Sequence, residues 1–202
     1  MLSNIGPAAL LILAVNIGIG IAGLWGNPRI IERCVFRPYE FARGRRRGTL
    51  IASGFAHADV PHLLFNMVTF FFFGIPMERL LGTGPFVLLY ALGLALSPLI
   101  SLARHRDNPA YATLGASGAV SAVLFAFVVY FPTTKMIIFP IPLPISAWVF
   151  ALGYLAYSIW SARSNTSRIN HDAHLAGALT GIAFVVITNP GAVGRLLRIF
   201  GM

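Results

Sequence analysis

Four polar side chains stand out in this otherwise apolar sequence because together they could perform nucleophilic catalysis. Ser117 lies within Gly115-Ala116-Ser117-Gly118, and His174 begins a later apolar run. A serine hydroxyl becomes a strong nucleophile when a base takes its proton, and His174 is a suitable base. His62 and Asn66 are four residues apart, so they share one helical face and could stabilise the oxyanion that forms when a carbonyl is attacked. The set predicts acyl-transfer chemistry.

The composition predicts the kind of scaffold that must position these groups. Of 202 residues, 57% are hydrophobic and only 10% are charged, and the mean hydropathy is +0.77. A soluble domain carries about 25% charged residues, so a water-soluble globule is excluded. The apolar runs are long and continuous, which argues against the alternating segments of a membrane β-barrel. We therefore expect an all-α polytopic membrane protein.

Six apolar segments approach the roughly 20 residues that a membrane-spanning helix requires. With no internal repeat and no second domain, residues 1–202 are expected to form a single transmembrane domain. The predicted helices are Ile5–Leu24, Pro61–Leu81, Pro85–Leu102, Leu114–Phe131, Leu143–Trp160 and Ala173–Thr188.

This topology would bring the four polar residues together. The second, fourth and sixth helices run in the same direction, so their N-terminal ends share one side of the membrane. Asn66, Ser117 and His174 each precede the end of their predicted helix by 14 or 15 residues, which is roughly 21–23 Å. They should therefore lie at one depth, within a wet pocket that opens to one side.

A glycine pair suggests how the serine and the histidine could be brought close. Gly177 and Gly181 follow His174 at the small-xxx-small spacing that allows close contact between membrane helices. If the partner is the helix that carries Ser117, this contact would set the distance between the two side chains.

The ordered set of motifs resembles the rhomboid family of intramembrane serine proteases over nearly the whole chain. The matching motifs are His62-x-x-x-Asn66, Gly74-x-x-x-Glu78-x-x-x-Gly82, Gly115-x-Ser117-Gly118 and Ala173-His174-x-x-Gly177-x-x-x-Gly181. The resemblance implies a Ser117–His174 dyad, with Ser117 as nucleophile and His174 as general base. It also implies that His62, Asn66 and the Ser117 backbone N–H stabilise the oxyanion, and that the substrates are single-span membrane proteins.

Other positions agree with the family or depart from it. Glu78 is expected to be a polar anchor at a helix end, and His57 a structural residue. Asp172 is only two residues before His174 and so points away on a helix, which argues against a catalytic triad. Many rhomboids carry a tyrosine one turn after the serine, where this chain has Ser121, and a Trp-Arg pair where it has Gly48-Thr49.

Three other functions compete with proteolysis. A rhomboid-like pseudoprotease would bind membrane clients without cleaving them, but such proteins usually lack the serine or the histidine. A histidine-rich membrane metalloenzyme could use the pairs His57/His62 and His171/His174, yet the chain has only five histidines and no H-E-x-x-H motif. A transporter is disfavoured because no matching broken helices occur in the two halves. We expect no cofactor, no metal and no nucleic-acid partner.

The predicted orientation in the membrane contains a conflict. The compact core suggests a bacterial inner membrane, and the family resemblance implies cytoplasmic termini. However, the first, third and fifth loops carry eleven of the fifteen basic residues, which by the positive-inside rule would make those loops cytoplasmic. The Arg-rich first loop, residues 26–60, could instead bind anionic lipids on either side of the membrane.

Overall fold

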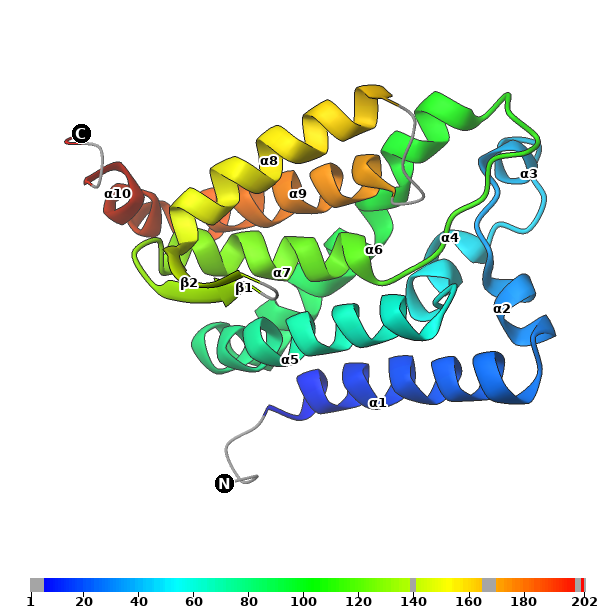
Figure 1. The fold of residues 1–202 in the computed structure, drawn as a ribbon, viewed down its shortest axis with the longest axis horizontal. Helices are drawn as coiled ribbons and strands as arrows, with labels where there is room; N and C mark the ends of the chain where they lie inside the picture. Colours follow the sequence, from blue (N-terminus) through cyan, green and yellow to red (C-terminus); the bar gives the residue numbers. More distant parts are fainter. Residues whose placement is uncertain (1–5, 139–140, 165–169, 199–200, 202) are drawn as a thin grey trace.

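The structure, a computed structural model, describes residues 6–138, 141–164, 170–198 and 201, and it is mostly helical (Figure 1). Ile5, the predicted start of the first helix, and Arg168 of the fifth loop lie outside the described residues. In chain order the elements are α1 (Pro7–Ile21), the π-helical turn η2 (Ala22–Gly26), α2 (Arg29–Cys34), α3 (Pro38–Ala42), α4 (Thr49–Ala52), the 3-10 turn η3 (Ser53–Phe55), α5 (Val60–Leu81), α6 (Thr83–His105), α7 (Ser117–Tyr130), β1 (Lys135–Ile138), β2 (Ile141–Ser146), α8 (Ala147–Ser164), α9 (His171–Thr188) and α10 (Pro190–Arg198).

Four segments of the described chain are long and apolar enough to cross a membrane, which makes this a multi-pass membrane protein. They are Pro7–Gly26, Val60–Leu81, Thr83–His105 and His171–Thr188. The other two predicted spans are shorter apolar helices, so the prediction of six full-length spans is not confirmed.

Local backbone chemistry explains why both of these helices begin later than predicted. Gly115 has a φ of +124°, which keeps the residues before Ser117 out of α7. The predicted start of the fifth helix, Leu143, belongs instead to β2, which pairs with β1 in an antiparallel hairpin. Pro142 and Pro144 have no backbone N–H to donate within a helix, so α8 begins only at Ala147.

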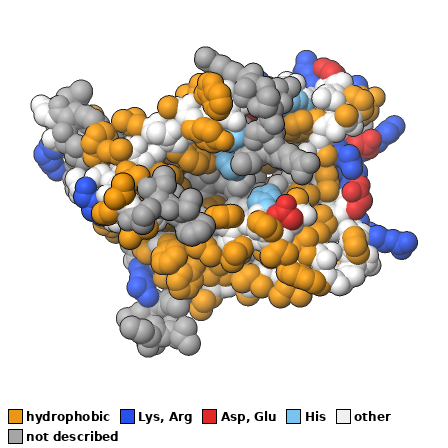
Figure 2. Space-filling model, viewed as in Figure 1, with side chains coloured by type: hydrophobic (Ala, Val, Ile, Leu, Met, Phe, Trp, Pro, Cys, Tyr) orange, Lys and Arg blue, Asp and Glu red, His pale blue; other side chains and the backbone are white. Residues whose placement is uncertain are grey.

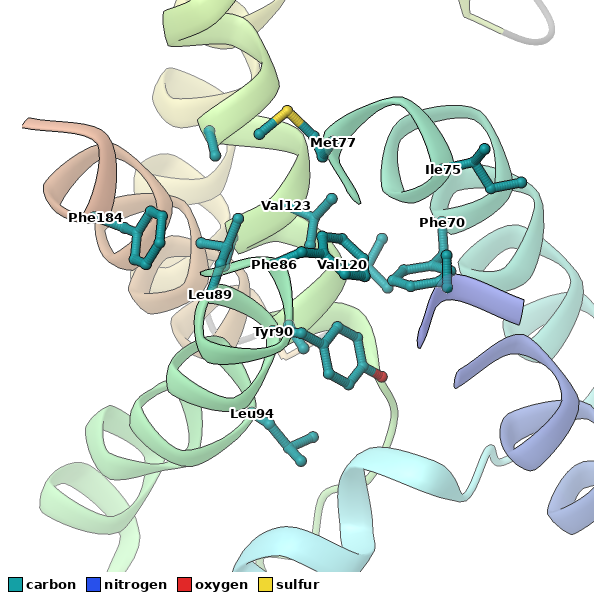
Figure 3. Packing of buried hydrophobic residues seen from close by; sticks show 14 of the residues in the cluster. Phe70, Ile75, Met77, Phe86, Leu89, Tyr90, Leu94, Val120, Val123 and Phe184 are labelled. Carbon is teal, nitrogen blue, oxygen red and sulfur yellow. The ribbon is translucent and has the colours of Figure 1, made fainter. Parts of the chain in front are cut away.

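Helix α7 is the centre of the molecule. Figure 1 shows it between α5 and α9, and it packs against α6 as well. Almost every residue from Gly118 to Tyr130 is buried, as expected for a helix that is apolar on all sides. Figure 3 shows Val120 and Val123 of α7 among Phe70, Phe86 and Leu89 in the core. Because other helices surround α7, the N-terminal end of α7 lies among these helices and not on the outside of the bundle.

The helices that carry the candidate residues are parallel, as the predicted topology requires. The N-terminal ends of α5, α7 and α9 all lie toward the right-hand end of Figure 1. Two of these ends carry side-chain caps: Asp59 accepts a hydrogen bond from the His62 backbone N–H at 2.7 Å, and Asn170 accepts one from Ala173 at 3.1 Å.

A buried acidic side chain fastens the first span to the core. The carboxyl oxygens of Glu78 accept hydrogen bonds from the backbone N–H groups of Ala8 and Ala9, at 3.1 and 2.7 Å. The Thr83 hydroxyl donates a third, at 2.9 Å. Glu78 therefore satisfies first-turn donors of α1 that have no partner within their own helix. This confirms the prediction that Glu78 is a structural anchor.

The first loop is held by an arginine close to the position where the family's Trp-Arg pair is missing. Arg46 donates a hydrogen bond to the Glu32 carbonyl and lies 3.8 Å from the Glu32 carboxylate. Its φ of +49° is unusual for a residue other than glycine. This contact ties the turn before α4 to α2.

Candidate active site

The turn before α7 is shaped by a glycine and a histidine ring. A Cβ atom on Gly115 would lie 2.6 Å from the imidazole of His62, and the positive φ of Gly115 also excludes a side chain. His62 therefore sits directly against the turn that leads into Ser117. As the first residue of α7, Ser117 has a backbone N–H with no partner in its own helix.

Glycines bring α7 and α9 into backbone contact. A Cβ on Gly177 would overlap the Gly118 carbonyl oxygen, and one on Gly181 would overlap the Ala122 carbonyl oxygen. The small-xxx-small pair on α9 thus meets the helix that carries Ser117, which is the partner that the sequence analysis considered.

This contact fixes the level of Ser117 and His174. Ser117 immediately precedes Gly118, and His174 lies almost one turn before Gly177. Both side chains therefore sit just above the point where the two helices touch, and both are half-buried. The structure shows no hydrogen bond between these two side chains.

A small cavity lies beside the serine. It has a volume of about 20 Å³ and is lined by Ser117, Ser97, Thr113 and Asn170, together with apolar residues such as Leu94 and Leu114. That is room for one water-sized molecule, with several polar groups to hold it.

The His174 ring stacks on a tyrosine that the sequence analysis did not identify. The rings of Tyr154 and His174 are nearly parallel, with an interplanar angle of 14° and centroids 6.2 Å apart. The Tyr154 hydroxyl lies 3.3 Å from the hydroxyl of Ser121. Many rhomboids carry a tyrosine at the position of Ser121. In this chain the tyrosine beside His174 comes from α8 instead.

Asn66 lies one turn below His62 on α5 and is buried. Its side-chain amide donates a hydrogen bond to the His62 carbonyl at 2.9 Å. An asparagine amide has two N–H groups, and this contact uses one of them. Histidine side chains reach the surface in the middle of the face that Figure 2 shows, among hydrophobic side chains.

Asp172 and Asn170 have structural roles at the start of α9. The Asp172 carboxylate pairs with Arg104 of α6, which agrees with the prediction that it points away from His174. The Asn170 amide donates hydrogen bonds to the hydroxyls of Ser101 and Thr113, each at 2.9 Å, in addition to capping α9. The sequence analysis missed Asn170, although an asparagine just before a helical run is a recognisable N-cap signal.

His57 is fully buried against the ring of His62, with ring centroids 5.1 Å apart. Neither of its ring nitrogens has a hydrogen-bond partner among the described residues. Burial lowers the pKa of His57 to about 4, and His62 acts in the same direction. His57 is therefore neutral at physiological pH.

This neutral histidine should make stability pH-dependent. The unfolded chain, with an ordinary histidine pKa of about 6.5, binds more protons than the folded protein between about pH 6.5 and 4. The contribution of neutral His57 to the free energy of unfolding is therefore fully present above pH 6.5. It is lost as pH drops through that window, by up to about 3 kcal/mol. We expect His57→Leu to remove this part of the dependence, measured by thermal unfolding in detergent at pH 7 and pH 4.5. Equal acid destabilisation of both proteins would contradict the prediction.

Within the described chain, no three His, Cys, Asp or Glu side chains are grouped so that they could hold a metal ion. The pairs that resembled histidine boxes are packed as rings against each other. His57 and His62 form an edge-to-face pair, and so do His171 and His174, with centroids 6.0 Å apart.

The fold and the site together define a helical membrane protein with a serine and a histidine placed on adjacent glycine-packed helices. The sequence pattern of the Rhomboid domain matches residues 45–190, and the chain belongs to the rhomboid family. Members of this family are usually intramembrane serine proteases.

Relatives are found in several eukaryotes. The chain is 28% identical over 184 residues to Rhomboid protein 1, mitochondrial, of Saccharomyces cerevisiae, covering 88% of this chain and 53% of that protein. It is 30% identical over 154 residues to RHOMBOID-like protein 12, mitochondrial, of Arabidopsis thaliana, covering 68% and 45%. It is 28% identical over 198 residues to human Rhomboid-related protein 4, covering 91% and 58%. The chain thus spans about half the length of these relatives.

Proposed function

We propose that this protein is an intramembrane serine protease that cleaves the transmembrane segments of single-span membrane proteins. The observation that supports this most strongly is the backbone contact of α7 with α9, because Ser117 directly precedes one contacting glycine, Gly118, and His174 lies three residues before the other, Gly177. Both residues are present, so a client-binding pseudoprotease has no observation in its favour.

In the proposed reaction, the Ser117 Oγ forms a bond to the scissile carbonyl carbon while His174 accepts the hydroxyl proton. The carbonyl oxygen becomes an oxyanion, for which the Ser117 backbone N–H, His62 and Asn66 are the available donors. His174 then gives its proton to the leaving amine as the C–N bond breaks. A water molecule, deprotonated by His174, hydrolyses the acyl-enzyme and restores the serine.

The expected substrates follow from the position of the site. A peptide bond within a helix has its carbonyl hydrogen-bonded and covered by side chains, so a substrate must unwind locally before Ser117 can attack. The half-buried site therefore favours membrane segments that contain helix-weakening residues such as glycine.

An alkyl fluorophosphonate tests the nucleophile directly, because an activated serine displaces its fluoride and keeps the phosphonyl group. We expect purified wild-type protein in detergent to be labelled and Ser117→Ala to be unlabelled. Ser146→Ala, at the far end of the hairpin, should label like wild type. His174→Ala should label at least 100-fold more slowly, because the base is lost. If Ser117→Ala and His174→Ala were both labelled like wild type, the protein would not be a serine hydrolase that uses these residues. If wild type were labelled but cleaved no membrane substrate, the pseudoprotease would be favoured.

Tyr154 is expected to orient the catalytic base. Replacing its ring by leucine removes the stacking partner of His174, and such aromatic pairs contribute about 0.5–1.5 kcal/mol. We therefore expect Tyr154→Leu to lower kcat by roughly 10-fold with little change in KM, while Tyr154→Phe keeps most activity.

Tyr157→Leu is the matched control for Tyr154, because Tyr157 lies one turn away on α8 and contacts His171 instead. Cleavage of a fluorogenic transmembrane substrate in micelles gives both kinetic constants. A fall of the same size in Tyr157→Leu would show that α8 packing, and not the ring on His174, is responsible.

We also propose the family orientation, with the termini in the cytoplasm and the site open to the opposite side. The predicted bacterial inner membrane draws no support from the relatives, because two of the three named above are mitochondrial by name. An impermeant maleimide should label Arg45→Cys, in a Cys34→Ser background, only from the side opposite the cytoplasm. Labelling from the cytoplasm alone would reverse the orientation and agree with the count of basic residues.

A further inference from the structure

A second hollow lies outside the candidate active site, between α3 and the C-terminal end of α6. It is a groove of about 540 Å³, and apolar side chains form one part of its lining, including Phe41, Leu99 and Leu102. Two arginines, Arg47 and Arg106, line another part of it. The groove is therefore apolar in one part and cationic in another.

The apolar part lies along a membrane-spanning helix. Leu99 precedes Arg106, the C-cap of α6, by seven residues, which is about 10 Å along the helix. Leu99 is 41% exposed in the structure. Thr83–His105 is long and apolar enough to cross a membrane, so we expect this end of α6 near one membrane surface and Leu99 at the depth of the hydrocarbon.

Arg43, which does not line the groove, holds its two sides together. The Arg43 guanidinium donates hydrogen bonds to the carbonyls of Tyr39 and Arg106, at 3.1 and 3.0 Å. It also lies 3.5 Å from the centre of the Tyr39 ring. These contacts fasten α3 to the end of α6, so the two walls of the groove are held together.

The cationic part has a surplus of positive charge. Asp107 is the neighbouring carboxylate, 3.5 Å from Arg106 and 3.9 Å from Arg43. Arg47 forms no ion pair with any carboxylate in the described parts of the chain. Its guanidinium folds back over the turn at Gly44, where φ is +78° and a Cβ would lie 3.4 Å from Nη2. The Arg47 guanidinium therefore lies in van der Waals range of the turn at Gly44, beside the groove.

We propose that this groove binds one acidic glycerophospholipid. Its phosphate would accept hydrogen bonds from Arg47 and Arg106, and one acyl chain would lie along Leu99, Leu102 and Phe41. A free phosphate would leave the apolar part uncovered, and a zwitterionic lipid would bring a cation close to two arginines. The proposal is independent of proteolysis, and it assigns the anionic-lipid binding expected of the first loop to a defined site.

Native mass spectrometry of the protein in dodecyl maltoside tests this site. The probes are palmitoyl-oleoyl phosphatidylglycerol, the matching phosphatidylcholine, and inorganic phosphate. We expect the phosphatidylglycerol complex to form at roughly 10-fold lower lipid concentration than the phosphatidylcholine complex. Arg47→Ala/Arg106→Ala should remove that preference, because each arginine supplies a charge-assisted hydrogen bond.

Two further variants test whether the lipid preference comes from the groove or from the positive charge of the protein as a whole. Arg29→Ala/Arg33→Ala removes the same charge from exposed positions on α2 and should leave the preference intact. Ala103→Trp fills the groove without changing charge and should weaken binding of both lipids. Equal loss in the two double variants, unchanged binding in Ala103→Trp, or displacement of the lipid by millimolar phosphate would each overturn the proposal.

Discussion

Replacing Gly177 by alanine should reduce proteolysis by at least 100-fold. The new methyl group would overlap the backbone carbonyl oxygen of Gly118, and a backbone atom cannot move aside as the end of a side chain can. The two helices must therefore separate, which carries His174 away from Ser117. A misplacement of about 1 Å can cost 100-fold in rate. The measurement is kcat/KM for a fluorogenic transmembrane substrate.

Gly153→Ala is the matched control, because a Cβ at that position on α8 meets nothing within 4 Å. It should keep wild-type activity and stability. Gly177→Ala should also unfold more easily, by about 1–3 kcal/mol, as overpacked sites generally do. If Gly177→Ala retained activity within twofold of wild type, the glycine contact would not set the geometry of the site.

The second large effect is expected at Glu78. Glu78→Ala leaves the backbone donors of Ala8 and Ala9 without their acceptor and opens space in the core. Loss of buried hydrogen bonds to an acidic side chain should destabilise the protein by about 3 kcal/mol and release α1 from α5. Thermal unfolding in detergent, together with proteolytic sensitivity of the first span, measures both consequences.

Three variants make this expectation specific. Glu78→Gln keeps one acceptor oxygen and should lose less stability than Glu78→Ala. Gly6→Ala leaves the carboxyl group intact but places a methyl group on top of it, so it should weaken the same anchor. Asp107→Ala removes an exposed carboxylate and should change stability by less than about 0.5 kcal/mol. A Glu78→Ala protein as stable as wild type would show that α1 is held by apolar contacts alone.

The two departures from the family pattern had different outcomes. The loop without the Trp-Arg pair is held by Arg46, a neighbour that sequence reasoning could suggest. The ring beside His174 comes from Tyr154, which no motif or spacing indicated. Whether a ring on one helix reaches a side chain on another depends on helix rotation and crossing, and these are products of packing.

The bounds of the helices were also predicted with unequal success. Val60–Leu81 agrees with its prediction to within one residue, because hydropathy and a capped start are local properties. The fourth and fifth predicted helices were too long at their N-terminal ends. Gly115 and the prolines of β2 delay the starts of these helices, through backbone conformations that an average of hydropathy does not detect.

The sequence by itself determined the class of protein and the parallel direction of α5, α7 and α9, and it predicts a common depth for Asn66, Ser117 and His174. Those conclusions need only the number, order and length of apolar segments, which are properties of the chain read in one dimension. Only the tertiary structure decided that α9 touches α7, that Tyr154 lies on His174, and that α3 forms a groove with α6. Each of these depends on which faces of two distant segments meet, and that is settled when the whole core packs.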